Sequence, residues 1–516
     1  MTMRGICKDL GFAAVAVVAA VSVVGQTVAP PFPVKRTETP ETWRRDGWNA
    51  ITRAKNTRLR TGKAKNVILF VGDGMGIATL TAARTFEGQS RGESGEENRL
   101  SFEEFPFSAF SKTYSTNQQT SDSAPTMSAI VTGVKTDEGI ISVDQNVQHG
   151  NYRTVAGNEA KTTLEYAEES GRSTGVVSTA RLTHATPGAC YAHTAARDWE
   201  SDADIFLRNK DAAAAKFPDI ARQLIEFKYG DGLEVALGGG RTKFLPNTVT
   251  DPEYATRKGE RLDGRDLTQE WTAKYRDSAF VWNRTQFDAI DVKKTKHLFG
   301  LFEPSHMKWE HDRAGDTAGE PSLAEMTVKS IDILSTNKKG YFLMVEGGRI
   351  DHAHHDGNAY RALRDTVALS DAVRAAVGKV NLDETLIIVT ADHSHTLFIQ
   401  GYPIRGNNIL GLVREVDGNG DPEPAYKLGR DRKPFTTLGY ANGPGTPAGE
   451  RPVLDWQAVL APDYQQEAHI PMTAETHGGE DVAIFATGVN AHLIRGSMEQ
   501  NWIFYVMADA MRVGRK

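Results

Sequence analysis

The segment Val67-Ile-Leu-Phe-Val-Gly-Asp-Gly-Met-Gly76 decides how this chain folds. An unbroken apolar run that ends in glycines is typical of a strand buried on both faces, followed by a tight turn. The glycines do not form a dinucleotide-binding fingerprint, because Ile77 stands where its last glycine belongs. An ordinary strand-to-helix turn remains the alternative. We expect a parallel strand that carries Asp73 to the ligand-binding edge of a sheet.

Further apolar runs have the same character and alternate with helix-like stretches. The runs cover residues 174–178, 233–237, 341–345, 385–389 and 481–485, and we interpret all of them as buried parallel strands. The helix-like stretches include residues 164–169, 219–227, 323–335 and 359–380. This alternation predicts an α/β fold, a mostly parallel central sheet sandwiched by helices.

Composition excludes several classes of protein. The 516 residues are 40% hydrophobic and 24% charged, which rules out collagen, coiled coil and general disorder. The formal net charge is -6, and no block of like charge stands out along the sequence. We therefore expect neither a nucleic-acid groove nor a polybasic membrane surface.

The N-terminus has the pattern of a secretory signal peptide, which we assign to residues 1–25. Arg4 and Lys8 precede an apolar run over residues 10–24 that is short for a membrane span. Its removal takes away Cys7 and leaves Cys190 without an intrachain disulfide partner, so bound metal is one candidate stabiliser. The C-terminus lacks the hydrophobic tail of a lipid-anchor signal. We expect a soluble protein, periplasmic or secreted, without a membrane anchor.

The remaining residues divide into three parts. Residues 26–62 form an N-terminal arm with a helix expected over 41–54. Residues 63–400 and 471–516 form the catalytic α/β domain. Residues 401–470, rich in Gly, Pro, Asn and Asp, form an irregular inserted subdomain anchored by aromatic residues. These anchors are Tyr402, Phe435, Tyr440 and Trp456.

A possible nucleophile lies in Thr120-Ser-Asp-Ser-Ala-Pro-Thr-Met-Ser-Ala129. Small residues follow Ser123, so this serine stands near a helix start. A hydroxyl there is often only an N-cap. The same position also receives anions and activates nucleophiles. The G-x-S-x-G elbow of a hydrolase triad is absent.

Metal-ligating side chains gather in Val345-Glu-Gly-Gly-Arg-Ile-Asp-His-Ala-His-His355. Asp351 and His355 are four residues apart, so on a helix they share one face and can hold one metal ion. Glu346 stands at a strand end, where it can address a second ion.

A second buried strand delivers Asp392 and His393 at its tip, and His477 precedes another strand. A chance cluster and a satisfied loop histidine are the plain alternatives. Ligands without thiolates suit zinc with an open position plus a harder ion such as magnesium. Two close divalent ions and a serine are the apparatus of phosphoryl displacement, which also needs an arginine fork.

Longer motifs extend this pattern over nearly the whole chain. They are Thr183-His-Ala-Thr-Pro187, Tyr191-Ala-His-Thr-Ala-Ala-Arg-Asp-Trp199, Ala236-Leu-Gly-Gly-Gly-Arg241, Arg261-Leu-Asp-Gly-Arg265, Val281-Trp-Asn-Arg284, Leu301-Phe-Glu-Pro304 and Ala391-Asp-His-Ser-His395. Through them the chain resembles the alkaline phosphatases from about Lys65 to Met511. The similarity is closest to the animal-type (intestinal/placental-like) branch, in a bacterial-type soluble export form.

The resemblance implies roles for individual residues. Ser123 is the expected nucleophile, and Arg197 clamps two phosphoryl oxygens. The implied ligands are Asp73, Asp392 and His393 for one zinc, Asp351, His355 and His477 for the other zinc, and Asp73, Thr186 and Glu346 for magnesium, with His184 just behind them. A calcium site is also implied, with Glu253, the backbone of Phe302, Glu303 and Glu320, which stands where the family has Asp.

The implied reaction is metal-dependent hydrolysis of phosphate monoesters to an alcohol and inorganic phosphate through phosphorylated Ser123, with broad specificity and an alkaline optimum. A homodimer is implied too, with residues 401–470 as the crown at its interface and the arm embracing the partner. The chain departs from the family at Thr120, usually Val, and Pro125, usually a small residue; a first helical turn tolerates proline.

Other functions are a phosphodiesterase or sulfatase of the same metallo-fold, or a non-catalytic phosphate- or metal-binding protein. Ser123-Ala-Pro-Thr-Met127 lacks the arginine of the sulfatase motif, and Arg197 favours a dianionic monoester.

Overall fold

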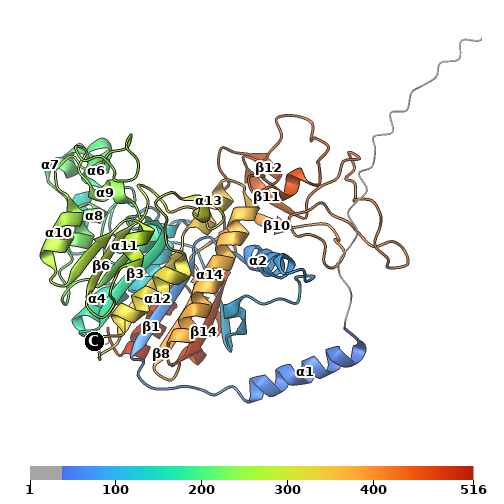
Figure 1. Cartoon of the computed structure of the whole chain (residues 1–516), viewed down its shortest axis with the longest axis horizontal. Helices are drawn as coiled ribbons and strands as arrows, with labels where there is room; N and C mark the ends of the chain where they lie inside the picture. The colour runs from blue at the N-terminus through green and yellow to red at the C-terminus, as the bar shows by residue number, and fades with distance from the viewer. Residues whose placement is uncertain (1–37, 515–516) are drawn as a thin grey trace, which may run out of the picture.

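The computed structural model describes residues 38–514, and its centre is a ten-stranded sheet with the order β15-β2-β14-β8-β1-β7-β3-β4-β6-β5 (Figure 1). The strands are β1 (Asn66–Gly72), β2 (Phe107–Lys112), β3 (Ser173–Arg181), β4 (Val235–Gly239), β5 (Ser278–Val281), β6 (His297–Leu301), β7 (Tyr341–Gly347), β8 (Thr385–Ala391), β14 (Val482–Gly488) and β15 (Gly496–Glu499). Most neighbouring pairs run parallel, which confirms the expected α/β class.

Helices cover both faces of this sheet (Figure 1). Those that position the site or the core are α2 (Ile77–Ser90), α3 (Ser123–Thr132), α4 (Thr163–Glu169), α8 (Ile220–Ile225), α12 (Leu323–Leu334), α13 (Arg349–His355), α14 (Ala359–Lys379) and α15 (Trp502–Met511). Alternate residues of β1 enter different cores: Val67 and Leu69 share one with α3, α4 and α15, whereas Ile68 and Phe70 share the other with α2, α12 and α14. The apolar run is unbroken because both faces of the strand are buried.

One strand runs against the expectation from the sequence. The run at 481–485 belongs to β14, which pairs antiparallel with both β8 and β2. The prediction of a parallel strand there was wrong. After β8 the chain stays at the carboxyl ends of the parallel strands through the segment 401–470 and re-enters the sheet from that same edge, so β14 runs in the opposite direction.

The two segments outside the main sheet are unlike it. Helix α1 (Pro40–Lys55) buries none of its residues, and Trp48 is 72% exposed. Residues 401–470 are mostly irregular around a small sheet of β10 (Leu397–Ile399), β11 (Leu438–Gly443) and β12 (Ala468–Pro471). Of the expected aromatic anchors Tyr440 is fully buried, but Tyr402 is 86% exposed.

The predicted signal peptide lies outside the described residues. Within residues 38–514, the helices are all too short or too polar to cross a membrane.

Candidate active site

The predicted site residues meet at the carboxyl ends of three neighbouring strands. Asp73 follows β1, Glu346 lies near the end of β7, and Asp392 follows β8. Strand β1 pairs in parallel register with both others, so Gly72 lies beside Gly347 and Ala391. Side chains far apart in sequence therefore converge, as expected for parallel strands.

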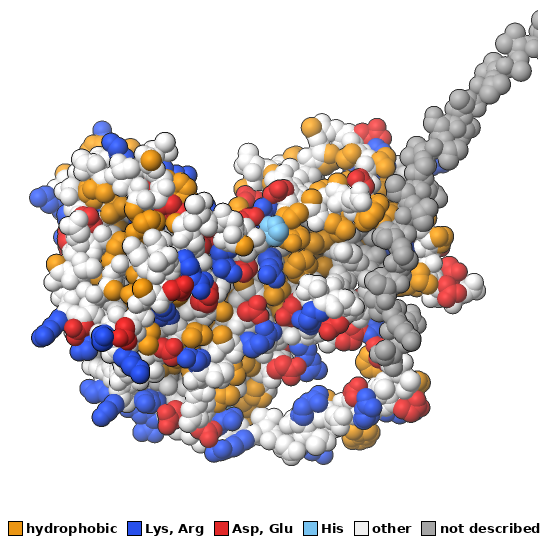
Figure 2. Space-filling view, viewed as in Figure 1, with side chains coloured by type: hydrophobic (Ala, Val, Ile, Leu, Met, Phe, Trp, Pro, Cys, Tyr) orange, Lys and Arg blue, Asp and Glu red, His pale blue; other side chains and the backbone are white. Residues whose placement is uncertain are grey.

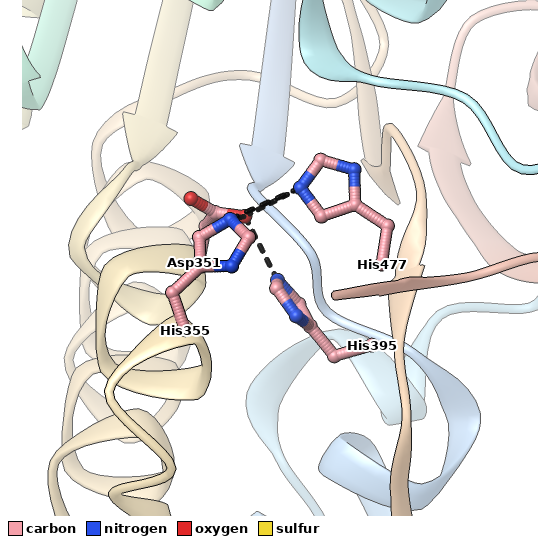
Figure 3. Close-up of side chains that lie close together, drawn as sticks. All are labelled: Asp351, His355, His395 and His477. Atoms are coloured by element: carbon pink, nitrogen blue, oxygen red, sulfur yellow. Dashed lines mark hydrogen bonds and ion pairs between the residues drawn. The ribbon is translucent and has the colours of Figure 1, made fainter. Parts of the chain in front are cut away.

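A first group consists of Asp351, His355, His395 and His477, which Figure 3 shows converging on the Asp351 carboxylate. Asp351 and His355 lie on α13, while His395 and His477 are paired across two short strands, β9 (Ser394–His395) and β13 (His477–Gly478). The Nε2 atoms of His355 and His477 are 3.1 Å apart, and each is 3.4 Å from Asp351 Oδ1.

These separations suit a tetrahedral cation. Ligands at 2.0–2.1 Å from a tetrahedral zinc lie about 3.3 Å from one another. The Nδ1 atoms of His355 and His477 face the backbone carbonyls of Glu475 and Ser121, which fixes the tautomer that leaves Nε2 as the ligand atom. Burial opposes ionisation of Asp351, but the three histidines hold its pKa well below the usual range.

His395 differs from its neighbours and was not assigned a role from the sequence. Its Nε2 lies 2.8 Å from Asp351 Oδ1, and its Nδ1 lies against Glu475 Oε2. Burial opposes protonation, but the Glu475 carboxylate, together with Asp351, raises the pKa of His395 to about 10. With a carboxylate at each nitrogen, the ring is a doubly protonated donor that orients Asp351. The spacing in Asp392-His-Ser-His395 could have hinted at it, but Glu475 lies eighty residues away.

A second group surrounds the hydroxyl of Ser123. The His393 Nε2 atom lies 3.0 Å from Ser123 Oγ, 3.4 Å from Asp73 Oδ1 and 3.5 Å from Asp392 Oδ2. Ser123 Oγ is also 3.3 Å from Asp73 Oδ1. These are again edge lengths of a tetrahedron around a zinc-sized ion. The structure thus brings together the three residues predicted for one zinc and the predicted nucleophile.

A third group presents oxygen atoms. Asp73 Oδ2, Thr186 Oγ1 and Glu346 Oε1 are buried and have no hydrogen-bond partner within residues 38–514. Asp392 Oδ2, in the second group, is also buried and has no hydrogen-bond partner within these residues. Buried polar atoms are almost always paired, so these orphaned oxygens are best explained by cations that they would coordinate. An all-oxygen set suits a hard ion such as magnesium.

The pKa shifts of these carboxyl groups also indicate a site for cations. Burial, with the Asp392 charge next in size, raises the pKa of Asp73 well above its usual range. Burial also raises the pKa of Asp392 to about 6 and that of Glu346 to about 7. Carboxylates packed this closely destabilise one another unless positive charge is added. The donor set therefore fits divalent cations.

Arg197 lies beside this centre. Its Nη1 donates to Asp122 Oδ2 at 2.9 Å, and its Nη2 lies 3.1 Å from His184 Nε2. A guanidinium can only donate, so His184 Nε2 accepts, and the neutral ring carries its proton on Nδ1. Burial, aided by the Arg197 charge, lowers the pKa of His184 well below its usual range, so the ring is neutral. His184 lies close to Asp73 and Glu346, and its protonated Nδ1 is buried without a hydrogen-bond partner within residues 38–514.

A fourth group lies apart, at the end of β6. Carboxylate oxygens of Glu253, Glu303 and Asp316 lie within 4.8 Å of one another. Glu320, predicted for this site, is not in this group: its carboxylate accepts from the backbone N–H of Lys308 at 2.9 Å. Burial, then the charges of Glu303 and Asp316, raises the pKa of Glu320 to about 9.

Asp316 was missed because it comes from the 310–320 loop, whose shape cannot be derived from its sequence. Phe302 is buried beside Glu303, directly after β6.

Comparison with known proteins gives one consistent family. The profile of the family described as alkaline phosphatase matches residues 64–513. The chain is 42% identical over 503 residues to the tissue-nonspecific alkaline phosphatase isozyme of Rattus norvegicus, covering 96% of this chain and 93% of that protein.

Solved structures share the fold. An alkaline phosphatase of Thermus thermophilus superposes with a TM-score of 0.63 at 22% identity, covering 90% of this chain and 94% of that one. A variant of the alkaline phosphatase of the Antarctic bacterium TAB5, solved with Mg bound in its M3 site, gives 0.59 at 20% identity, covering 89% and 100%.

Proposed function

This chain belongs to the alkaline phosphatase family, and from that premise we propose that it hydrolyses phosphate monoesters through a phosphorylated Ser123. The enzyme class and the metal-dependence follow from the family match and the 42% identical relatives. The covalent intermediate, the identity of each metal and the residue roles are our proposals.

One observation carries the proposal: Ser123 Oγ lies at a vertex of the group formed by Asp73, Asp392 and His393. A serine whose only role was to cap α3 would not have to lie beside Asp73 and His393. Asp122 is the N-cap of α3, and its Oδ1 accepts from the Ala124 N–H at 3.1 Å. Ser123 is therefore free to react.

We assign zinc to the two Asp/His groups and magnesium to the group of Asp73, Thr186 and Glu346. When bound, these cations supply Lewis-acid stabilisation of the attacking and leaving oxygens of an in-line phosphoryl displacement.

The chain itself binds and orients the phosphoryl group. The Arg197 guanidinium, held between Asp122 and His184, has N–H groups left to clamp two phosphoryl oxygens. Ser123 is the first residue of α3, and the N–H groups at the N-terminus of this helix favour negative charge near Ser123 Oγ. Ser123 first accepts the phosphoryl group and then releases it to water. Because the contacts address the phosphoryl group, specificity for the alcohol is broad.

Calcium at the fourth group is a further part of the proposal. Glu253, Glu303 and Asp316, with the backbone carbonyl of Phe302, would hold it, while the Glu320 carboxylate accepts from the Lys308 N–H. Lys308 Nζ, 2.9 Å from Glu303 Oε1, competes for the same carboxylate. A Glu303→Ala variant that keeps its calcium content would contradict this assignment.

We also propose that the enzyme is an exported homodimer. The exposed tryptophans of α1 and the 86% exposed Tyr402 support a second copy covering α1 and the segment 401–470. Sedimentation equilibrium of the chain without residues 1–55 should give the monomer mass. Export by residues 1–25 is tested by the N-terminal sequence of the protein recovered from the periplasm or the medium.

The decisive experiment measures phosphate release from an aryl monoester, from about pH 6 to about pH 11, by the chelated and the zinc- and magnesium-loaded enzyme. We expect activity that rises with pH and requires metal, and loss of activity in Ser123→Ala. Acid-quenched wild-type protein should carry phosphate on Ser123 in a mass spectrum. Hydrolysis of only diesters or sulfate esters would favour the alternative activities, and no hydrolysis at all would favour a binding protein.

A further inference from the structure

The end of the sheet opposite the active site has a cavity of about 450 Å³ lined by six cationic side chains. They are Lys63, Lys65, Arg172, Lys338, Lys339 and Arg512. These residues precede β1, β3 and β7 or follow α15, so the amino ends of three adjacent strands bring them together. None of the described residues that line the cavity is Asp or Glu. Figure 2 shows Lys and Arg side chains gathered where Figure 1 marks the C-terminus.

Among the described residues, these cations have no carboxylate partner. Within residues 38–514, none of the six side chains forms an ion pair, whereas the buried Arg241 and Arg261 pair with Asp251 and Asp219. The chain as a whole is acidic, with a net charge of -6, so carboxylates are not scarce. Like charges held around one cavity repel one another, and a bound anion would relieve that repulsion.

Arg172 is the deepest of the six and is 3% exposed. Its guanidinium donates to Ser170 Oγ at 2.6 Å and to the carbonyls of Lys65 at 3.2 Å, Met511 at 3.0 Å and Ala64 at 3.4 Å. These bonds use four of its five N–H groups and leave one on Nη1. Burial without a carboxylate lowers the pKa of Arg172. A buried, unneutralised guanidinium is costly unless an anion completes it.

The loops that carry the charges are tied together. Gly171 and Gly340 both have positive φ, and the Ser173 N–H donates to the Gly340 carbonyl at 3.1 Å. Asn337 Nδ2 donates to the Gly171 carbonyl at 3.0 Å, and a Cβ on Gly340 would lie 2.0 Å from the Lys65 carbonyl oxygen. The backbone beneath the cations is therefore fixed before any ligand arrives, which lowers the entropy cost of binding.

We propose that this cavity binds a compact anion carrying several phosphate groups. Six cations exceed what one phosphate needs, and the described lining residues include no aromatic ring that could stack a nucleobase. Such an anion can be a free oligophosphate or the headgroups of anionic phospholipids. Strand β1 has seven residues, so the cavity lies about 23 Å from the catalytic group. The inference does not depend on the proposed catalytic mechanism.

The test uses the metal-loaded enzyme and the double variant Lys338→Glu/Lys339→Glu. Both lysines are exposed, so the fold should tolerate the change. Lys210→Glu/Lys216→Glu is the control, with the same change of charge on exposed residues outside both the cavity and the segment 401–470. Unchanged melting temperature and unchanged turnover of an aryl monoester establish that the variants are folded.

Two arms distinguish the sources. Calorimetric titration with diimidotriphosphate, whose P–N–P links resist hydrolysis, should show a binding event in the wild type and the control that the Lys338→Glu/Lys339→Glu variant lacks. Cosedimentation with phosphatidylglycerol vesicles should be salt-sensitive and at least about tenfold weaker in that variant. Loss of diimidotriphosphate binding in the variant identifies a free oligophosphate as the ligand, and loss of vesicle binding identifies phospholipid headgroups. If the variant binds both probes like the wild type, the proposal is overturned.

Discussion

The link between Glu475, His395 and Asp351 yields a quantitative prediction. In His395→Asn the amide nitrogen takes the place of Nδ1, so the bond to Glu475 survives and the bond to Asp351 is lost. In His395→Gln the amide nitrogen takes the place of Nε2, so the bond to Asp351 survives and the bond to Glu475 is lost. Each lost charge-assisted hydrogen bond should lower the free energy of unfolding by about 1.5–3 kcal/mol.

The two variants should differ in metal affinity. Removing a partner that orients a ligand typically weakens metal binding 10–100-fold. We expect His395→Asn to lose this much zinc affinity, because Asp351 is no longer held, and His395→Gln to lose clearly less. Competition with a chromophoric chelator measures the affinity, and urea unfolding of the metal-free protein measures stability. His149→Asn, at an exposed histidine, is the control. Wild-type zinc affinity in His395→Asn would refute this positioning role.

Three further predictions follow from other parts of the structure. Burial, with Glu234 next, raises the pKa of Glu168 to about 10, so the folded state keeps a proton that the unfolded state releases above about pH 4.5. The free energy of unfolding should therefore fall by up to about 1.4 kcal/mol per pH unit from pH 6 to pH 8. Urea unfolding of Glu168→Gln should show a much weaker dependence on pH over this range, whereas the exposed Glu169→Gln should keep the wild-type dependence. Thr120 is exposed, so Thr120→Val should change kcat/KM less than about twofold in a steady-state assay. The orphaned site oxygens lack partners within residues 38–514, so bound cations should stabilise the fold, and chelation should lower the melting temperature measured by calorimetry by at least about 5 °C.

Local sequence predicted the strands well because both faces of the central sheet are buried. The run at 67–71 and those at 341–345 and 385–389 lie within β1, β7 and β8. The predicted strand at 233–237 was displaced, since β4 covers Val235–Gly239. Strand direction was beyond this reasoning: the composition of β14 is the same in either direction, and only its path from the segment 401–470 makes it antiparallel.

The site was predictable where one motif carries both the ligand and its geometry, as with Asp351 and His355 on one helix face. It was not predictable where a residue acts through a distant partner. His395 owes its role to Glu475, and Asp316 owes its place to a loop. The basic cavity does not appear in the sequence as a block of like charge, because its cations come from separate short segments.

The two ends of the sheet obey one geometric rule. In a parallel sheet, residues that precede the strands gather at one edge and residues that follow them gather at the other. Strand β1 has Lys65 before it and Asp73 after it, and β7 has Lys339 before it and Glu346 near its end. Short strands thus separate excess positive charge from excess negative charge by about 23 Å. Each edge then needs a ligand of opposite sign: cations where the carboxylates meet, and a phosphate-rich anion where the lysines meet. An enzyme held by its basic edge on an anionic surface would keep the catalytic edge directed toward the solution, where its substrates diffuse.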